Sequence, residues 1–269
     1  MQYDPIKRSL GVVFNKTPML RKLFYRLLDI LLLRSWHIKR ELRKWAIGKN
    51  TGINILDAGA GFGQYVYQMS TINENFKIKG VDVKEEQIAD CNAFFKAINK
   101  QDRVTFEYAD LTTFNEPAKY DLILSVDVME HILEDVKVFE NFVQSMKKGG
   151  MLLISTPSDQ GGSDVHDDHD DGFVDEHVRN GYNIQEIQDK LLKAGFSEVE
   201  ARYSYGCPGK IAWKLSMKYP ILILNTSKLF FIILPFYYIL FSPFILILNF
   251  RDLYKTHKSG TGLIVKAWK

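Results

Sequence analysis

The sequence is poor in cysteine, and the two that it has, Cys91 and Cys207, lie far apart in the chain. Two isolated cysteines form neither a disulfide framework nor the paired spacing of a zinc finger, and they suit a reducing compartment. The first ten residues lack the apolar core of a secretory signal peptide. Internal repeats and low-complexity tracts are also missing. A chain of 269 residues is nevertheless long enough for one large α/β domain with additions.

Acidic residues are scarce in two segments. Residues 1–50 carry 12 Lys and Arg against 3 Asp and Glu, and residues 207–258 carry 7 against 1. The block between them, 51–206, carries 14 against 28. The net charge of +3 therefore conceals an acidic globular part flanked by two basic, apolar segments. Basic charge beside long apolar runs favours an anionic membrane surface over nucleic acid, for which the sequence has no recognisable binding motif.

Short apolar stretches typical of strands alternate with helical stretches from residue 51 onward, which predicts a doubly wound parallel sheet. The expected strands are 53–57, 76–82, 103–108, 120–126, 150–155, 197–205 and 261–268. The expected helices between them are 62–72, 84–99, 134–147 and 183–194, and Gly149-Gly150 should end the third. A further helix over 18–47, starting at Pro18, is amphipathic and should either pack on this domain or lie at a membrane interface.

The most informative stretch is a buried strand that ends in Asp57 and turns through Gly59, Gly61 and Gly63. Glycines let backbone approach a ligand closely, and the following helix offers unpaired N–H groups, so the turn is suited to a nucleoside cofactor. The dinucleotide fingerprint G-x-G-x-x-G needs a glycine where this chain has Gln64. The spacing G-x-G-x-G, with an acid two residues before it, resembles motif I of the class I S-adenosylmethionine (SAM) methyltransferases.

Two further strand ends extend this resemblance. Asp82 and Val83 end the second strand, where an acid can accept both ribose hydroxyls. Asp110 and Leu111 follow the third strand, where the family binds the adenine amino group. The alternative for any one of these acids is a helix N-cap. The resemblance implies a Rossmann-like seven-stranded sheet whose last strand is antiparallel, and SAM as cofactor.

The resemblance also divides the chain into four parts. Residues 1–50 are expected to form basic amphipathic helices, and 51–206 the SAM-binding core. Residues 207–258 form an apolar insertion between the last two strands, and 259–269 the last strand. In the family these two strands have a short connection, so the insertion is the main departure from its pattern.

A candidate reaction site follows the fourth strand. If a helical turn begins at Asp127, then Asp127, Glu130 and His131 lie on one face. This segment resembles E-x-x-E-H of the ubiquinone-biosynthesis O-methyltransferases, which implies a divalent cation, Mg or Zn, that lowers the pKa of a phenolic acceptor. The alternative is that these residues cap and pack a helix. His166 and His169, in an acidic loop after the fifth strand, are candidates for a general base, unless the loop is simply solvated.

Residues 229–248 are twenty consecutive uncharged residues, which is long enough to span a bilayer. The flanking strands should pair in one sheet, so both ends must stay on the same side of a membrane. We therefore expect a helical hairpin that dips into one leaflet, broken into short pieces by Pro220, Pro235 and Pro243. The alternatives are a dimerisation face or a lid over an apolar pocket.

These observations predict a SAM-dependent methyltransferase that acts on an oxygen of a hydrophobic or lipid-linked acceptor. The expected location is cytoplasmic, peripheral or monotopic at the inner face of the membrane. C- or N-methylation of a soluble metabolite and a non-catalytic SAM-binding or membrane scaffold protein remain alternatives. The sequence does not fix the oligomeric state.

Overall fold

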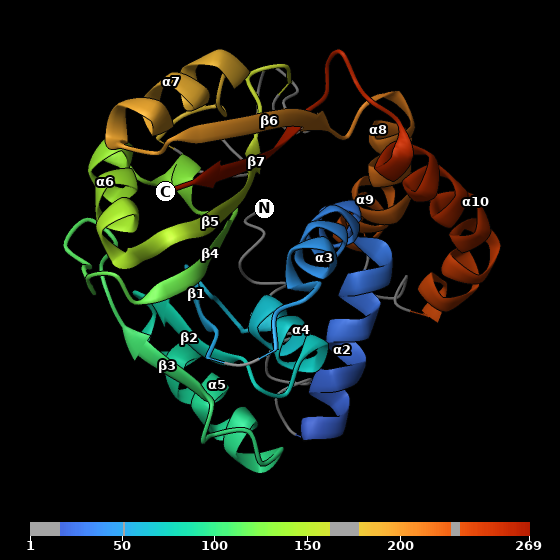
Figure 1. The fold of residues 1–269 in the computed structure, drawn as a ribbon. Coiled ribbons are helices and arrows are strands. Elements are labelled where there is room, and N and C mark those ends of the chain that lie inside the picture. Colours follow the sequence, from blue (N-terminus) through green and yellow to red (C-terminus); the bar gives the residue numbers. More distant parts are fainter. Residues whose placement is uncertain (1–16, 51, 162–177, 227–231) are drawn as a thin grey trace.

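The centre of the computed structural model is a seven-stranded sheet with the order β3-β2-β1-β4-β5-β7-β6 (Figure 1). The structure describes residues 17–50, 52–161, 178–226 and 232–269. In chain order the strands are β1 (Asn54–Ala58), β2 (Lys77–Asp82), β3 (Val104–Tyr108), β4 (Tyr120–Val126), β5 (Met146–Pro157), β6 (Glu198–Ser204) and β7 (Gly262–Trp268). Strands β1 to β5 pair in parallel, and β7 is antiparallel to both β5 and β6. The predicted Rossmann-like sheet with an antiparallel last strand is confirmed.

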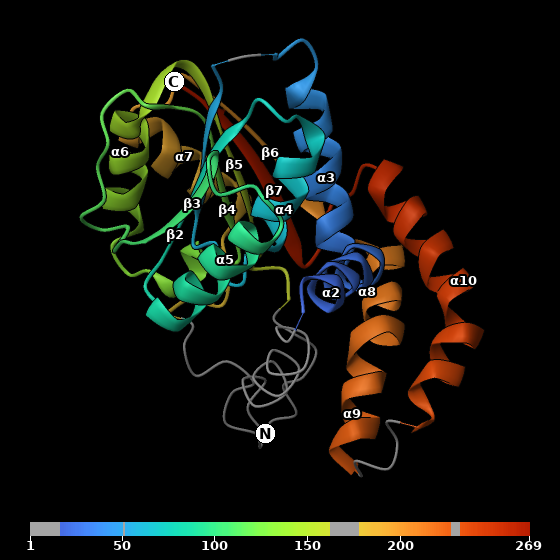
Figure 2. The same cartoon turned by 90° about the horizontal axis from the view of Figure 1, so that it is seen from below.

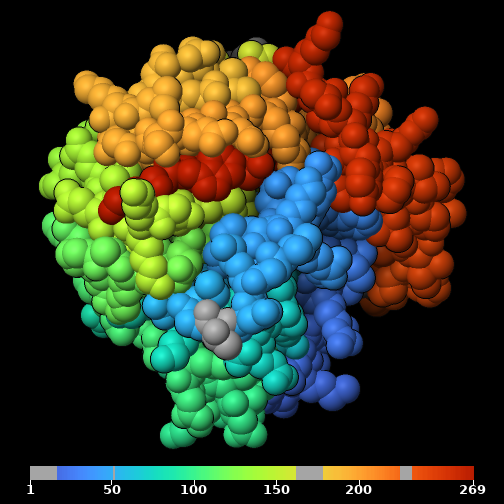
Figure 3. All heavy atoms as spheres, viewed as in Figure 1, coloured from blue at the N-terminus to red at the C-terminus, as the bar shows by residue number. Residues whose placement is uncertain are grey.

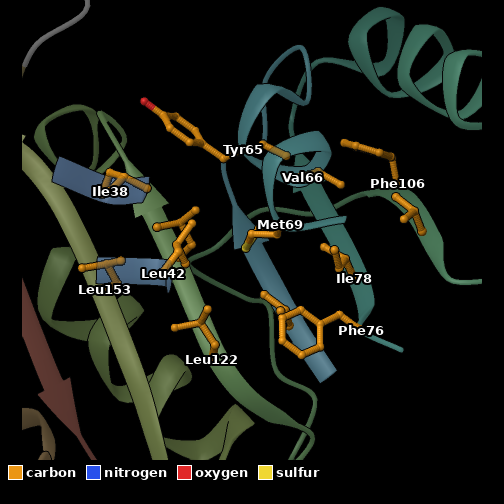
Figure 4. Close-up of a cluster of buried hydrophobic side chains, with 14 of the residues drawn as sticks. Ile38, Leu42, Tyr65, Val66, Met69, Phe76, Ile78, Phe106, Leu122 and Leu153 are labelled. Carbon is orange, nitrogen blue, oxygen red and sulfur yellow. The ribbon is translucent and has the colours of Figure 1, made fainter. Parts of the chain in front are cut away.

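Helices cover both faces of this sheet, which explains why its central strands are apolar on both sides. The helices are α3 (Leu33–Ala46), α4 (Gln64–Ile72) and α5 (Glu85–Ala97) on one face, and α6 (Asp135–Ser145) and α7 (Ile184–Ala194) on the other. Figure 4 shows part of the first layer, where Ile38 and Leu42 of α3 and Met69 of α4 lie over Leu122 and Leu153 of the sheet. The sheet is therefore held rigidly between two apolar layers.

The helix expected over 18–47 is two helices. Thr17 caps α2 (Pro18–Leu31) by accepting a hydrogen bond from the backbone N–H of Leu20. Leu32 then adopts an extended backbone, with φ −91° and ψ 111°, and α3 starts at Leu33. Because Leu32 and Leu33 are both buried, packing against the core fixes the bend between the helices.

One other predicted boundary was wrong. Gly149-Gly150 does not end a helix: α6 stops at Ser145, and both glycines lie inside β5. Gly149 has φ +76°, and the pairing with β4 shifts register there, so the glycines form a bulge. Strand–helix alternation also fails once, because the connection 109–119 between β3 and β4 consists of turns.

The insertion folds as two antiparallel helical arms. The first arm runs through α8 (Cys207–Trp213), the π-helical turn η2 (Lys214–Lys218) and α9 (Tyr219–Thr226), and the second is α10 (Leu234–Tyr254). We call these two arms the hairpin; Figure 2 shows them side by side at the edge of the molecule. The expected break at Pro243 is absent, because α10 continues through it.

Candidate active site

The predicted cofactor residues gather at one edge of the sheet. Asp57 is the last residue but one of β1, Asp82 is the last residue of β2, and Asp110 and Asp127 follow β3 and β4. These four strands are parallel neighbours, so their carboxyl ends meet at the same edge. The topology therefore brings together acids that lie up to 70 positions apart in the chain.

The glycine turn leaves open space at its middle position. A Cβ on Gly59 would lie 2.3 Å from a methyl group of Val128, and one on Gly63 would lie 3.1 Å from the ring of Phe106. A Cβ on Gly61 would meet nothing closer than 3.7 Å. All three glycines have positive φ, so the chain turns sharply here. Gly59 and Gly63 therefore fit the turn against the core, while Gly61 faces open space.

Asp82 faces this turn from the neighbouring strand. Its Oδ2 accepts a hydrogen bond from the backbone N–H of Gly61 at 2.8 Å, and its Oδ1 accepts one from Lys84 at 3.0 Å. The following residue, Val83, is exposed at the mouth of the site. A carboxylate fixed beside the glycine turn is placed to accept the hydroxyl groups of a ribose.

The third acid, Asp110, closes a turn after β3. Its Oδ1 accepts hydrogen bonds from both the backbone N–H and the hydroxyl of Thr112, each at 2.8 Å. The backbone and side-chain hydrogen bonds lower the pKa of Asp110, which keeps it ionised. Leu111 beside it is buried against the core. The structure thus places Asp110 and Leu111 directly after β3, beside the end of β2, and their contact with adenine stays a prediction.

Among the three predicted cofactor acids, Asp57 is the one that is buried. Burial and the nearby charge of Asp82 raise the pKa of Asp57 to about 8. Its Oδ2 has no hydrogen-bond partner among the described residues. An unpaired buried acid next to an open glycine turn fits a ligand that carries positive charge. SAM carries both an ammonium and a sulfonium group, so the residues present fit this cofactor.

The predicted cation site is wrong. No group of three or more His, Cys, Asp or Glu side chains within the described ranges is placed to hold a metal ion. Asp127 has φ +52° and does not start the expected helical turn; only Met129–His131 form a short 3-10 turn. The carboxylate of Asp127 forms an ion pair with Arg34 of α3.

The side chain of Glu130 lies in the core. It is buried, and its Oε2 accepts the hydroxyl hydrogen of Thr156 at 3.0 Å. Burial, followed by the charge of Asp127, raises the pKa of Glu130 to about 8. Glu130 therefore packs and orders the end of β5, as the packing alternative for this segment predicts.

A cavity of about 240 Å³ adjoins the carboxyl ends of β4 and β5. Core residues on its wall include Arg34, Asp127 and Thr156. The β6–α8 segment and the hairpin complete it with Tyr205, Lys210 and Trp213. Sequence reasoning missed these residues, because nothing local in the chain marks them as neighbours of Asp127. The predicted base candidates His166 and His169 lie outside the described residues.

Helix α2 is attached to the glycine turn from the side. The guanidinium of Arg21 donates a 2.8 Å hydrogen bond to the carbonyl of Phe62, within the turn, and the hydroxyl of Tyr25 donates to the same carbonyl. Arg21 also donates to the hydroxyl of Tyr25 at 2.7 Å, and the amide of Gln64 donates to Asp29 at 2.7 Å. The amphipathic pattern predicted the helix, but it gave no sign of these partners.

Comparison with known proteins identifies a methyltransferase domain in this chain. The family described as "Methyltransferase domain" matches residues 49–214, more than half of the chain. Phosphoethanolamine N-methyltransferase 1 of Arabidopsis thaliana is 31% identical over 163 residues, which cover 56% of this chain and 30% of that protein. The ubiquinone biosynthesis O-methyltransferase of Leptothrix cholodnii is 25% identical over 114 residues, covering 41% of this chain and 46% of that protein.

A solved structure shares the fold over nearly the whole chain. It is Haemonchus contortus phosphoethanolamine N-methyltransferase 2 in complex with phosphomonomethylethanolamine and S-adenosylhomocysteine, with a TM-score of 0.63 and 20% identity. The superposition covers 97% of this chain and 59% of that one. The matches to the plant phosphoethanolamine methyltransferases span only about a third of those proteins' length. With its glycine turn, its three strand-end acids and its sheet order, the chain belongs to the class I SAM-dependent methyltransferase domain family.

Proposed function

We propose that this protein transfers a methyl group from SAM to a hydroxyl of a hydrophobic or lipid-linked acceptor at a membrane surface. The observation that carries this proposal is the position of the cavity between the strand ends and the hairpin. Asp127 lies on its core side, while Lys210 and Trp213 of α8 lie on its hairpin side. An acceptor in this cavity meets the cofactor edge at one end and the apolar insertion at the other.

The residues of the cavity suit a direct displacement. When bound, SAM supplies an electrophilic methyl group on a sulfonium. The acceptor oxygen would bond to this carbon as the carbon–sulfur bond breaks, which would leave S-adenosylhomocysteine. The acceptor's proton must go to a base, and among the described residues that line the cavity Asp127 is the carboxylate that can accept it. The ion pair with Arg34 holds this carboxylate in place. In this proposal the protein's contribution is to position the reactants and to accept the proton.

The hairpin supports the membrane part of the proposal. Within the ranges that the structure describes, α10 is the one helix long and apolar enough to cross a bilayer, and only 11% of its most apolar window is buried. Its large exposed apolar side chains lie on one side of the helix, because each is three or four residues from another, and so they form one stripe: Phe236, Ile239, Leu240, Phe244, Ile247, Phe250 and Tyr254. Such a large exposed apolar stripe indicates an interaction surface.

N-methylation is the second candidate. The relatives that match 56% of this chain are phosphoethanolamine N-methyltransferases, at 29–33% identity. Their acceptor is a small polar amine by name, whereas the hairpin of this chain favours an apolar one. Mass spectrometry after incubation of the enzyme with SAM and a lipid extract should find a lipid heavier by one methylene. Fragmentation of that product then tells whether oxygen or nitrogen holds the new methyl group.

Cofactor binding is tested by the substitution Gly61→Arg. The arginine side chain would fill the open space at the middle of the glycine turn, so calorimetric titration should detect SAM binding in the wild type and none in the variant. Equal binding in both proteins would refute the cofactor site. Absence of S-adenosylhomocysteine release with every lipid extract, despite SAM binding, would favour a non-catalytic SAM-binding protein.

Membrane attachment is tested by flotation with vesicles of phosphatidylglycerol and phosphatidylcholine. Phe244 is 60% exposed on α10. The variant Phe244→Glu should therefore fold like the wild type, but it should lose most of its vesicle binding. Leu192→Glu is the matched control, because Leu192 is 47% exposed on α7, away from the hairpin. If the wild type stays soluble and sediments as a dimer that Phe244→Glu splits, the stripe is a dimerisation face.

A further inference from the structure

Helix α2 presents a second apolar stripe to the outside. Met19, Leu23, Leu27 and Ile30 are exposed and recur at four-, four- and three-residue steps. Arg21 and Tyr25, on the opposite side of the same helix, are buried. The helix is therefore packed on the core by one face while it leaves apolar side chains uncovered on the other.

The surroundings of this stripe suit an anionic bilayer. Lys22 and Arg26 flank it, and the only acid of α2, Asp29, is engaged with Gln64 and Gln68 of α4. Apolar side chains flanked by long basic ones are typical of helices that lie in a membrane interface, because Lys and Arg reach the headgroups. The charge of α2 is thus complementary to a surface rich in anionic lipid.

The stripe also adjoins the hairpin in space. Helix α2 contacts α10, and the guanidinium of Arg40, on α3, lies over the ring of Tyr254 at the end of α10. Figure 2 shows α2 nearly end-on beside α8, crosswise to the hairpin, and Figure 3 shows its surface adjoining that of α10. A bilayer that receives the hairpin is therefore within reach of α2.

The inner face of α2 is bonded to the cofactor site. Arg21 and Tyr25 both donate hydrogen bonds to the carbonyl of Phe62, and Tyr25 packs on the ring of Phe62 with centroids 6.1 Å apart. Arg21 also donates to the carbonyl of Asp90 at 3.0 Å. Phe62 lies between Gly61 and Gly63, so the position of α2 and the shape of the glycine turn are coupled.

We propose that the outer stripe of α2 is a second membrane contact and that bilayer contact at this stripe strengthens SAM binding. The inference rests on the proposed attachment through the hairpin. Lipid against the outer face adds contacts to α2 while its inner face keeps the bonds to Phe62, so the bilayer favours the ordered glycine turn. Coupling of two ligands is reciprocal, so SAM should also tighten vesicle binding.

The test measures the SAM dissociation constant of the full chain with and without vesicles of phosphatidylglycerol and phosphatidylcholine. Vesicles should tighten SAM binding by roughly five-fold or more in the wild type, the lower end of typical coupling. Leu23→Glu should abolish this gain, while its SAM affinity without vesicles stays at the wild-type value and shows that the variant is folded. Leu192→Glu is the matched control, because Leu192 is 47% exposed and Leu23 is 48% exposed. It should keep the gain in SAM affinity, since Leu192 lies on α7 and not on α2.

The outcomes separate this inference from the proposed function. Vesicle binding with unchanged or weaker SAM affinity would overturn the coupling and leave membrane attachment intact. An equal gain in Leu23→Glu and Leu192→Glu would overturn α2 as the contact. Failure of the wild type to float would instead remove the proposed membrane attachment, and the inference with it.

Discussion

Asp57 is a buried carboxyl group, and its titration should be visible in the stability of the protein. Burial and the charge of Asp82 raise its pKa to about 8, compared with 3.8 for an unperturbed Asp. Between these values the folded state binds more protons than the unfolded state. The contribution of Asp57 to stability is therefore fully present below the unfolded pKa of 3.8, and it is lost as the pH rises through the folded pKa of about 8.

We predict that Asp57→Asn flattens the fall in stability between about pH 5 and pH 8, because the amide does not titrate. The slope of the unfolding free energy against pH depends on how many more protons the folded state binds than the unfolded state. Reducing this number by one changes the slope by up to about 1.4 kcal/mol per pH unit. Urea unfolding of the SAM-free protein at several pH values measures this slope. Asp102→Asn is the control, because Asp102 is exposed. Equal slopes for the wild type and Asp57→Asn would contradict the prediction.

That the cofactor candidates gather at one edge of the sheet was predictable, whereas the arrangement of the residues after β4 was not. Asp57, Asp82 and Asp110 end successive parallel strands, and topology alone brings such ends together. The cation site depended on a helical turn beginning at Asp127, whose backbone is instead left-handed and whose side chain pairs with Arg34. A partner 93 positions away cannot be identified from local spacing.

At the scale of elements, Pro220 explains how the arms of the hairpin are joined. The N–H of Tyr219 bonds to the carbonyl of Lys214, five residues earlier, which makes η2 a π turn. Pro220 has no N–H, so it gives no helical hydrogen bond to Leu215 or Ser216. The hydroxyls of Tyr237 and Tyr238 on α10 donate to these two carbonyls, at 2.7 and 2.8 Å. The arms are therefore linked where the first arm lacks its own hydrogen bonds.

We predict that Tyr238→Phe lowers the free energy of unfolding by about 1–2 kcal/mol, because it removes the hydroxyl that donates a hydrogen bond to the carbonyl of Ser216. In the Pro220→Ala background the loss should be smaller, since alanine restores an N–H in the same turn. Chemical unfolding of the four proteins gives the coupling energy. Tyr254→Phe, an exposed tyrosine of the same helix, is the control. An identical loss in both backgrounds would contradict the prediction.

The sequence predicted the strands and most helices, but it overestimated the effect of proline. Pro235 lies in the first turn of α10, where a missing N–H costs nothing, and Pro243 is accommodated inside the helix. The pattern of apolar residues likewise predicted the hairpin, since both flanking strands had to join one sheet. How its arms pair depends on tyrosine contacts that no periodicity reveals.

At the scale of the whole molecule, Asp252 joins the hairpin to the methyltransferase core. It is fully buried near the end of α10, and its carboxylate accepts hydrogen bonds from the backbone N–H groups of Tyr205 and Gly209, at 3.2 and 3.0 Å. Nε2 of His37 on α3 lies 3.1 Å from the same carboxylate. One side chain of the insertion thus fixes the N-terminal helices, the end of β6 and the start of α8.

This position makes Asp252 a link between the hairpin and the acceptor cavity, because Tyr205 lines that cavity with a left-handed backbone of φ +54°. We predict that Asp252→Asn, which places an N–H₂ group against one of these donors, lowers the free energy of unfolding by about 3 kcal/mol. Hydrogen exchange should accelerate over 205–213, and KM for the acceptor should rise, while the glycine turn keeps the SAM dissociation constant unchanged. Slow exchange over 205–213 in the variant would contradict the link, and weakened SAM binding would mean that the hairpin and the cofactor site unfold together.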